Sequence, residues 1–186
     1  TATYNSSIHA IETEVGGLDN ILDYDDSTFE DSVAGWTAGG STTRAQSSAQ
    51  ALHGNDSMSL TRNATTGTAN AIMANTVPIR GGEMYTAQAW FRANTTGRTC
   101  QIQILYWNVA DGIGLVGGSS FSADCVDVNT GWRVAYAWGM APANADHVSV
   151  QVNILAVVAT EVHYVDQVGI FPGLRLELLT ENQSDL

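Results

Sequence analysis

The sequence predicts an all-β fold, with its strands arranged as a sandwich or a barrel. After residue 20 no segment keeps the 3.6-residue apolar period of a helix, whereas Gly, Ser, Thr and Asn interrupt the chain about every ten residues. The segments between these interruptions are short and alternate apolar with polar residues. Such spacing is typical of sandwiches and barrels, not of parallel sheets crossed by helices.

Seven segments alternate clearly enough to be predicted as strands. They are Ser57–Arg62, Met84–Ala93, Gln101–Asn108, Ser119–Val126, Trp132–Met140, Val148–Ala156 and Glu161–Phe171.

The two ends of the chain fit this pattern poorly. Residues 1–19 place Ile8, Ile11, Val15 and Leu18 at the spacing of a short amphipathic helix, so they form either a docking segment or a partly ordered tail. Residues 177–186 resemble residues 20–29 in outline, at an offset of 157 positions. We therefore expect a tail (1–19), one module (20–173), and a linker with the start of a second, similar module (174–186).

The net charge of −12 comes from the ends of the chain, because eight acidic residues precede the first basic residue, Arg44. The chain has no lysine, and its seven arginines are scattered, so it lacks the basic stripe that nucleic-acid binding requires. No apolar run reaches the roughly 18 residues of a membrane span. We expect neither nucleic acid nor membrane insertion among its interactions.

Cys100 and Cys125 are too few for a disulfide framework and lack metal-ligand spacing. A hairpin with a symmetric register about residues 111–114 would place the two residues opposite each other. Two interpretations stay open: a disulfide, or two buried free thiols.

Four short motifs occur in a fixed order. They are Phe29-Glu30-Asp31 followed by Gly35-Trp36, Leu52-His53-Gly54 followed by 57–60, Trp132 ten residues before Pro142, and residues 164–168. Together with a strand that opens at 81–85 and ends at Ala89-Trp90, this set resembles the jelly-roll carbohydrate-binding modules of bacterial glycanases, over residues 21–172. Residues 21–24 and 178–184 also resemble the start of such modules in minor tail proteins of phages that infect actinobacteria. The resemblance implies a β-sandwich jelly roll.

The resemblance also implies a structural calcium ion. Mapped onto this sequence, its ligands are Glu30 and Asp166, with Asn55 and Asp56 or nearby carbonyls completing the oxygen cage that a hard cation prefers. The loop reads Gly54-Asn55-Asp56-Ser57 where the family usually has Gly-Ser, so solvated carboxylates are the alternative.

A sugar site needs flat aromatic rings for stacking, and amides with a guanidinium for hydroxyl groups. Strand alternation assigns such side chains to positions facing away from the core, and we expect them to share one side. They are Gln88, Trp90 and Arg92; Gln103 and Trp107; and Gln151 and Asn153. Trp36 and Trp132 are expected in packing.

The strand after Trp132 has two possible registers. Alternation alone buries Val134, Tyr136 and Trp138, whereas the family spacing from Trp132 to Pro142 turns these residues outward. We favour the family register, which adds Tyr136 and Trp138 to the sugar site.

The sequence contains no nucleophile elbow, no zinc-protease motif and no phosphate-binding glycine loop, so we expect no enzyme activity. Three functions remain: a glycan-binding adhesion module of a phage tail, an accessory module of a secreted glycanase, or a structural spacer. The expected partners are polysaccharide or cell-wall glycan, other virion proteins or modules, and copies of the chain itself. The expected location is a virion or the extracellular space.

Overall fold

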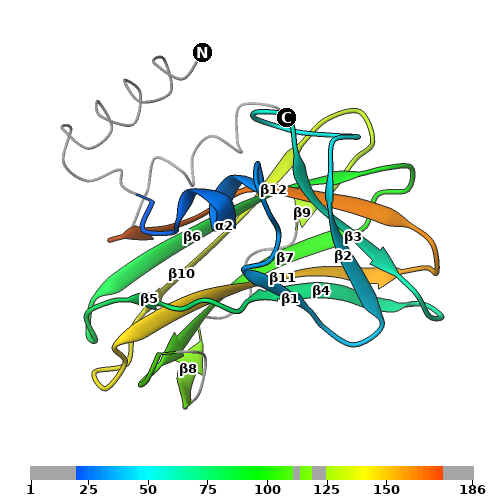
Figure 1. The fold of residues 1–186 in the computed structure, drawn as a ribbon. Helices are drawn as coiled ribbons and strands as arrows, with labels where there is room; N and C mark the ends of the chain where they lie inside the picture. The colour runs from blue at the N-terminus through cyan, green and yellow to red at the C-terminus, as the bar shows by residue number, and fades with distance from the viewer. Residues whose placement is uncertain (1–19, 111–113, 119–124, 174–186) are drawn as a thin grey trace.

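The computed structural model describes residues 20–110, 114–118 and 125–173 of the chain. The expected tail, the second-module start and most of the predicted strand Ser119–Val126 lie outside these residues. Within them, two antiparallel sheets pack face to face, so the prediction of a β-sandwich is confirmed (Figure 1).

The seven-stranded sheet contains β1 (Trp36–Ala38), β4 (Gly67–Met73), β11 (His147–Val157), β7 (Thr99–Trp107) and β8 (Leu115–Gly118) in that order. The short strands β5 (Val77–Pro78) and β9 (Cys125–Val126) add to it by pairing with β11 and β7.

The five-stranded sheet has the order β10 (Arg133–Met140), β6 (Met84–Ala93), β12 (Val162–Pro172), β3 (Ser57–Arg62) and β2 (Thr42–Ser47). From β3 onward the chain repeatedly crosses between the two sheets, so strands adjacent in sequence often lie on opposite sides of the core.

The core lies between the sheets and follows the predicted alternation. In β6, Tyr85, Ala87, Ala89 and Phe91 are buried and face β7 and β11 residues such as Ile102 and Val150. β-branched and aromatic side chains at every second position suit strands with one face in a core.

One short helix, α2 (Tyr24–Thr28), was not predicted. Five residues are too few to form a stable helix alone, so tertiary contacts must hold it. Ser27 Oγ donates to the Val168 carbonyl of β12 at 2.6 Å, and Trp36 Nε1 donates to the Asp26 carbonyl at 3.0 Å. Phe29 ends the helix in the left-handed region and packs edge-on against fully buried Trp36. The packing role predicted for Trp36 is confirmed.

Among the described residues, no helix combines the length and the apolar character needed to cross a membrane.

Candidate functional site

The nine predicted sugar-site residues do not share one face. Gln88, Trp90, Arg92, Tyr136 and Trp138 belong to β6 and β10 of the five-stranded sheet, whereas Gln103, Trp107, Gln151 and Asn153 belong to β7 and β11 of the other. Both groups point away from the core, so they lie on opposite outer faces of the sandwich. The expectation of a single face was wrong because alternation tells which side chains face the core, not which sheet a strand joins.

The register of β10 follows the family spacing. Ala135 and Ala137 face the core, and Tyr136 and Trp138 pair with Gln88 and Thr86 on the outer face of the five-stranded sheet. Trp138 is 47% exposed, but Tyr136 is only 6% exposed. Trp138 is therefore the predicted aromatic on this face that is most open to a ligand.

The outer face of the seven-stranded sheet carries two rows of amide side chains. Asn70, Asn153 and Gln101 are register partners across β4, β11 and β7, and Ile72, Gln151 and Gln103 form the adjacent row. Neighbouring strands lie about 4.8 Å apart, so the first row offers amides at a regular interval across three strands and the second row across two. Asn70 and Gln101 were not among the predicted site residues. The alternation that turns Gln103 outward does the same for Gln101, whereas Asn70 lies in β4, a strand that was not predicted.

The amide rows contain one unsatisfied donor. Gln151 Nε2 donates to Asn153 Oδ1 at 2.9 Å, which orients the Asn153 amide. Asn153 is 4% exposed, and its Nδ2 is buried with no hydrogen-bond partner among the described residues. A buried donor without an acceptor costs about 1–3 kcal/mol. Because this donor is covered, a ligand oxygen reaches it only if a neighbouring side chain moves.

Trp107 lies on the same face but is not a stacking surface. It is 9% exposed, and its Nε1 donates to buried Ser149 Oγ at 2.9 Å. The indole is thus held against the sheet. Its neighbour in register is His147, whose Nδ1 lies 2.6 Å from Asp146 Oδ1 at the end of the face. The two amide rows themselves contain no charged side chain.

On the opposite face, Trp90 and Arg92 are partly covered. Arg92 Nη2 donates to the Asn129 carbonyl at 3.1 Å, and Trp90 is the register partner of fully buried Asp166. Arg92 therefore holds the loop that contains Asn129.

The four predicted calcium ligands do meet in space, around the loop that precedes β3. Glu30 accepts hydrogen bonds from the backbone N–H groups of Asn55 and Asp56 at 3.0–3.1 Å. Asp166 Oδ2 accepts from the N–H groups of Leu52 and His53 at 2.8 and 3.2 Å. The two carboxylates thus hold this loop from both sides.

The other carboxylate oxygen of Asp166, Oδ1, accepts a hydrogen bond from the backbone of its own strand. Gln167 adopts a φ of 48° at a bulge in β12, and its N–H donates to Asp166 Oδ1 at 2.7 Å. Burial raises the pKa of Asp166 to about 6, and repulsion from Glu30 adds to this rise, while the three N–H donors oppose it.

These residues do not form an oxygen cage. N–H donors contact both oxygens of each carboxylate, and the described part of the chain holds no group of three or more His, Cys, Asp or Glu suited to a metal. Calcium requires six to eight oxygen ligands. Calcium binding therefore stays a sequence-based prediction that this geometry does not support.

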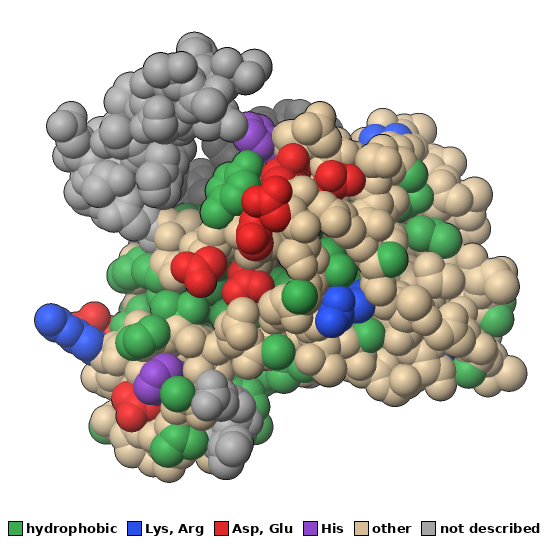
Figure 2. All heavy atoms as spheres, in the orientation of Figure 1, with side chains coloured by type: hydrophobic (Ala, Val, Ile, Leu, Met, Phe, Trp, Pro, Cys, Tyr) green, Lys and Arg blue, Asp and Glu red, His purple; other side chains and the backbone are tan. Residues whose placement is uncertain are grey.

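Acidic side chains also gather around α2, where Figure 2 shows them on one face of the molecule. Asp23, Asp25, Asp26 and Asp31 line a hollow of about 500 Å³. Asp26 is 6% exposed and accepts a hydrogen bond from Asn75, and burial raises its pKa.

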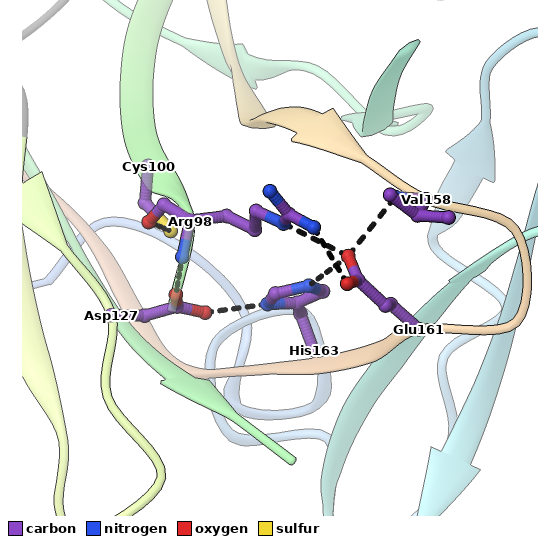
Figure 3. A network of polar contacts seen from close by, with 6 residues as sticks. All are labelled: Arg98, Cys100, Asp127, Val158, Glu161 and His163. Carbon is purple, nitrogen blue, oxygen red and sulfur yellow. Dashed lines mark hydrogen bonds and ion pairs between the residues drawn. The ribbon is translucent and has the colours of Figure 1, made fainter. Parts of the chain in front are cut away.

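A polar network links residues at the starts of β7 and β12 to the residue that follows β9 (Figure 3). His163 Nδ1 and Asp127 Oδ2 lie 2.6 Å apart, and the two residues are 1% and 0% exposed. Asp127 Oδ1 accepts from the Arg98 N–H at 2.6 Å. The Arg98 guanidinium binds both oxygens of Glu161 at 2.7–2.9 Å and lowers the pKa of that carboxyl to about 2.

This network joins three separate segments of the chain, so no local motif reveals it. An aspartate–histidine pair also occurs in hydrolases, but there it activates a nucleophile. Here the nearby thiol of Cys100 donates to the Arg98 carbonyl at 3.4 Å, and burial strongly raises its pKa. The network is therefore a structural element of the core.

The predicted pairing of the two cysteines is confirmed, because Cys100 and Cys125 are register partners across β7 and β9. Both thiols are free in the structure.

No protein-family model and no curated protein matches the chain. Among solved structures, a CBM22-1 xylan-binding domain from Paenibacillus barcinonensis is similar, with a TM-score of 0.61 and 16% identity over 86% of this chain and 97% of that one. The fold is that of a carbohydrate-binding module. The CBM22-1 and GH10 modules of a Clostridium thermocellum xylanase, solved with xylohexaose, give a TM-score of 0.62 at 18% identity.

A phage protein also shares the fold. The enzymatically active domain of tailspike protein 4 from bacteriophage CBA120 has a TM-score of 0.57 and 17% identity over 82% of this chain. The matched regions are 28% of the xylanase chain and 21% of the tailspike chain. At these identities the likeness concerns the fold.

Proposed function

We propose that this chain is a non-catalytic carbohydrate-binding module that recognises an uncharged polysaccharide through the two amide rows of its seven-stranded sheet. The observation that carries the proposal is the alignment of Asn70, Asn153 and Gln101 across three strands, next to Gln151 and Gln103. Each amide has an acceptor oxygen and two donor N–H groups, which match the hydroxyl groups of a sugar.

The lack of charge in these rows favours a neutral ligand. A uronic acid or phosphate polymer would bring anionic groups that the rows have no cation to pair with. Because Trp107 is held against the sheet and offers no open ring, we expect weak binding per module, which repeated copies would strengthen.

A specific observation favours a second candidate surface. Trp138 is the exposed aromatic of the five-stranded sheet and lies near Gln88 in register. A sugar ring could stack on this indole, and the two faces can be distinguished by substitution.

Calorimetric titration with xylohexaose and with other neutral oligosaccharides tests the proposal. We expect a Gln103→Ala, Gln151→Ala double variant to lose about 10-fold or more in affinity, since each lost hydrogen bond costs about 1 kcal/mol. Gln88→Ala is the matched control, because it removes the same amide from the opposite face, and it should change affinity less than about twofold. If Trp138→Ala loses glycan affinity while the Gln103→Ala, Gln151→Ala variant binds fully, the site lies on the five-stranded sheet instead. If no neutral glycan binds, the spacer function is the better account.

The biological setting is part of the same proposal. We place the module in a phage tail or similar virion appendage that attaches to host-surface glycan. Two findings support this setting: the resemblance of residues 21–24 and 178–184 to phage modules, and the shared fold with a tailspike protein. An accessory role in a secreted glycanase is the alternative, supported by the shared fold with a xylanase module. The labelled protein should bind host cells and be displaced by purified cell-wall polysaccharide. Binding to plant xylan alone would favour the glycanase setting.

A further inference from the structure

Cys100 and Cys125 form a preassembled pair at the end of β7. They are direct partners in the antiparallel register across β7 and β9. Cys100 belongs to the core, and Cys125 packs against it. Opposite residues of antiparallel strands have Cα atoms roughly 4.5–5.5 Å apart, within the range that a disulfide spans.

The backbone around this pair is held without help from the thiols. The Asp127 N–H donates to the Arg98 carbonyl at 3.1 Å, and the Arg98 N–H donates back to Asp127 Oδ1 at 2.6 Å. Asp127 is fixed in turn by His163 at 2.6 Å (Figure 3). β9 therefore stays in place against β7, and this keeps Cys100 and Cys125 opposite each other.

The two thiols differ in access. Cys100 is fully buried, whereas Cys125 is half-buried, so an oxidant reaches Cys125 first. Burial strongly raises the pKa of the Cys100 thiol, which makes its thiolate scarce. The second step of any exchange, in which Cys100 attacks, is then the slow one.

We propose that Cys100 and Cys125 are a redox-active pair that closes to an intramolecular disulfide when the folded chain meets a disulfide oxidant such as oxidised glutathione. The Cys125 thiolate attacks one glutathione sulfur and releases a glutathione thiolate, which takes up a proton. The Cys100 thiolate then attacks the Cys125 sulfur of the mixed disulfide and releases the second glutathione. One Sγ–Sγ bond forms, the two cysteines are oxidised, and the oxidant is reduced to two glutathione thiols.

The cross-link stabilises the module without touching the amide rows. It joins the start of β7 to β9 across the 24 residues between them, so the unfolded chain loses freedom while the folded chain keeps its register. The thiols face the core, whereas Gln101, the next residue after Cys100, faces outward. Oxidation is therefore expected to raise the melting temperature and to leave glycan affinity unchanged.

The test uses the full chain, reduced and then incubated with oxidised glutathione. We expect intact mass to fall by two hydrogens, both thiols to be lost from the unfolded protein, and the melting temperature to rise by about 10 °C in a manner that reductant reverses. A Cys125→Ser variant is the matched control: it retains the buried Cys100 thiol but cannot close the bond, so oxidant should leave its melting temperature unchanged. Two persistent free thiols, a glutathione adduct that never resolves, or a disulfide that does not raise the melting temperature would each overturn the proposal. Since the wild-type protein is compared with itself before and after oxidation, the outcome does not depend on how the variant folds.

Discussion

Asp166 makes the stability of this protein depend on pH in a direction opposite to that of most carboxylates. Its carboxyl is fully buried, and burial raises its pKa to about 6 from the ordinary value of 3.8. Between these two values the folded chain holds a proton that the unfolded chain has lost. Folding is therefore favoured at the lower pH, and this contribution declines as the pH rises through about 6.

The size of the effect follows from the shift. About two pKa units at 1.36 kcal/mol each give roughly 3 kcal/mol between pH 4 and pH 7, as an upper estimate for one group. Below pH 4 the carboxyl is protonated in both states, and above pH 7 it is ionised in both. The contribution is constant outside this window.

Urea unfolding of the wild type and of Asp166→Asn, at half-unit steps from pH 4 to pH 8, measures this contribution. Asparagine keeps the shape and one acceptor oxygen but cannot titrate, so subtracting the two free energies of unfolding removes the titration of all other groups. We expect the wild-type advantage to fall by up to about 3 kcal/mol as the pH rises from 4 to 7. A flat difference, or one that grows with pH, would show that the N–H donors from Leu52, His53 and Gln167 outweigh burial, and would refute the reasoning.

Three further predictions concern the same structural elements. His163→Ala should destabilise the fold by about 3 kcal/mol or more, since it leaves the Asp127 carboxylate buried without its imidazole partner; a loss below about 1 kcal/mol in urea unfolding would contradict the network's role. Gly54→Ala should cost more than Gly40→Ala, because both positions have positive φ, but a Cβ at 54 would lie 2.2 Å from Glu30 Oε1 whereas a Cβ at 40 meets open space; equal melting temperatures for the two variants would argue against the Glu30 contact. Adding a chelator should leave the melting temperature unchanged, since backbone N–H groups already occupy the Glu30 and Asp166 oxygens; a rise on adding calcium that the chelator reverses would restore the calcium prediction.

The strands with strong alternation could be predicted from sequence. β3 and β6 have the predicted bounds, and β7, β10, β11 and β12 differ from their predictions by one or two residues at an end. In β7 and β11 the inward positions carry large apolar side chains, so burial and period point to the same assignment. In β10 the inward residues are Ala135 and Ala137, and the family spacing, not alternation, indicated the correct register. β2 and β4 were missed because their threonine, alanine and glycine residues give little contrast between the two faces.

The candidate site could be predicted only in part. Alternation correctly predicted that Gln103, Gln151 and Asn153 face outward. The local sequence does not indicate that β6 and β7 belong to different sheets. The sheet to which a strand belongs is decided by pairing between segments far apart in the chain. The buried polar network depends on the same long-range pairing, so it could not be predicted from the sequence either. Its members are Arg98, Asp127, Glu161 and His163.

The most direct test of glycan recognition by the amide rows is a nuclear magnetic resonance titration that follows the side-chain NH₂ signals of asparagine and glutamine. As xylohexaose or another bound neutral oligosaccharide is added, we predict shifts of the Asn70, Gln101, Gln103, Gln151 and Asn153 signals, with those of half-buried Gln103 and Gln151 moving most. The Gln88 signal, on the opposite face, should stay in place. Movement of Gln88 and of the Trp138 indole signal, with the amide rows unchanged, would contradict the account.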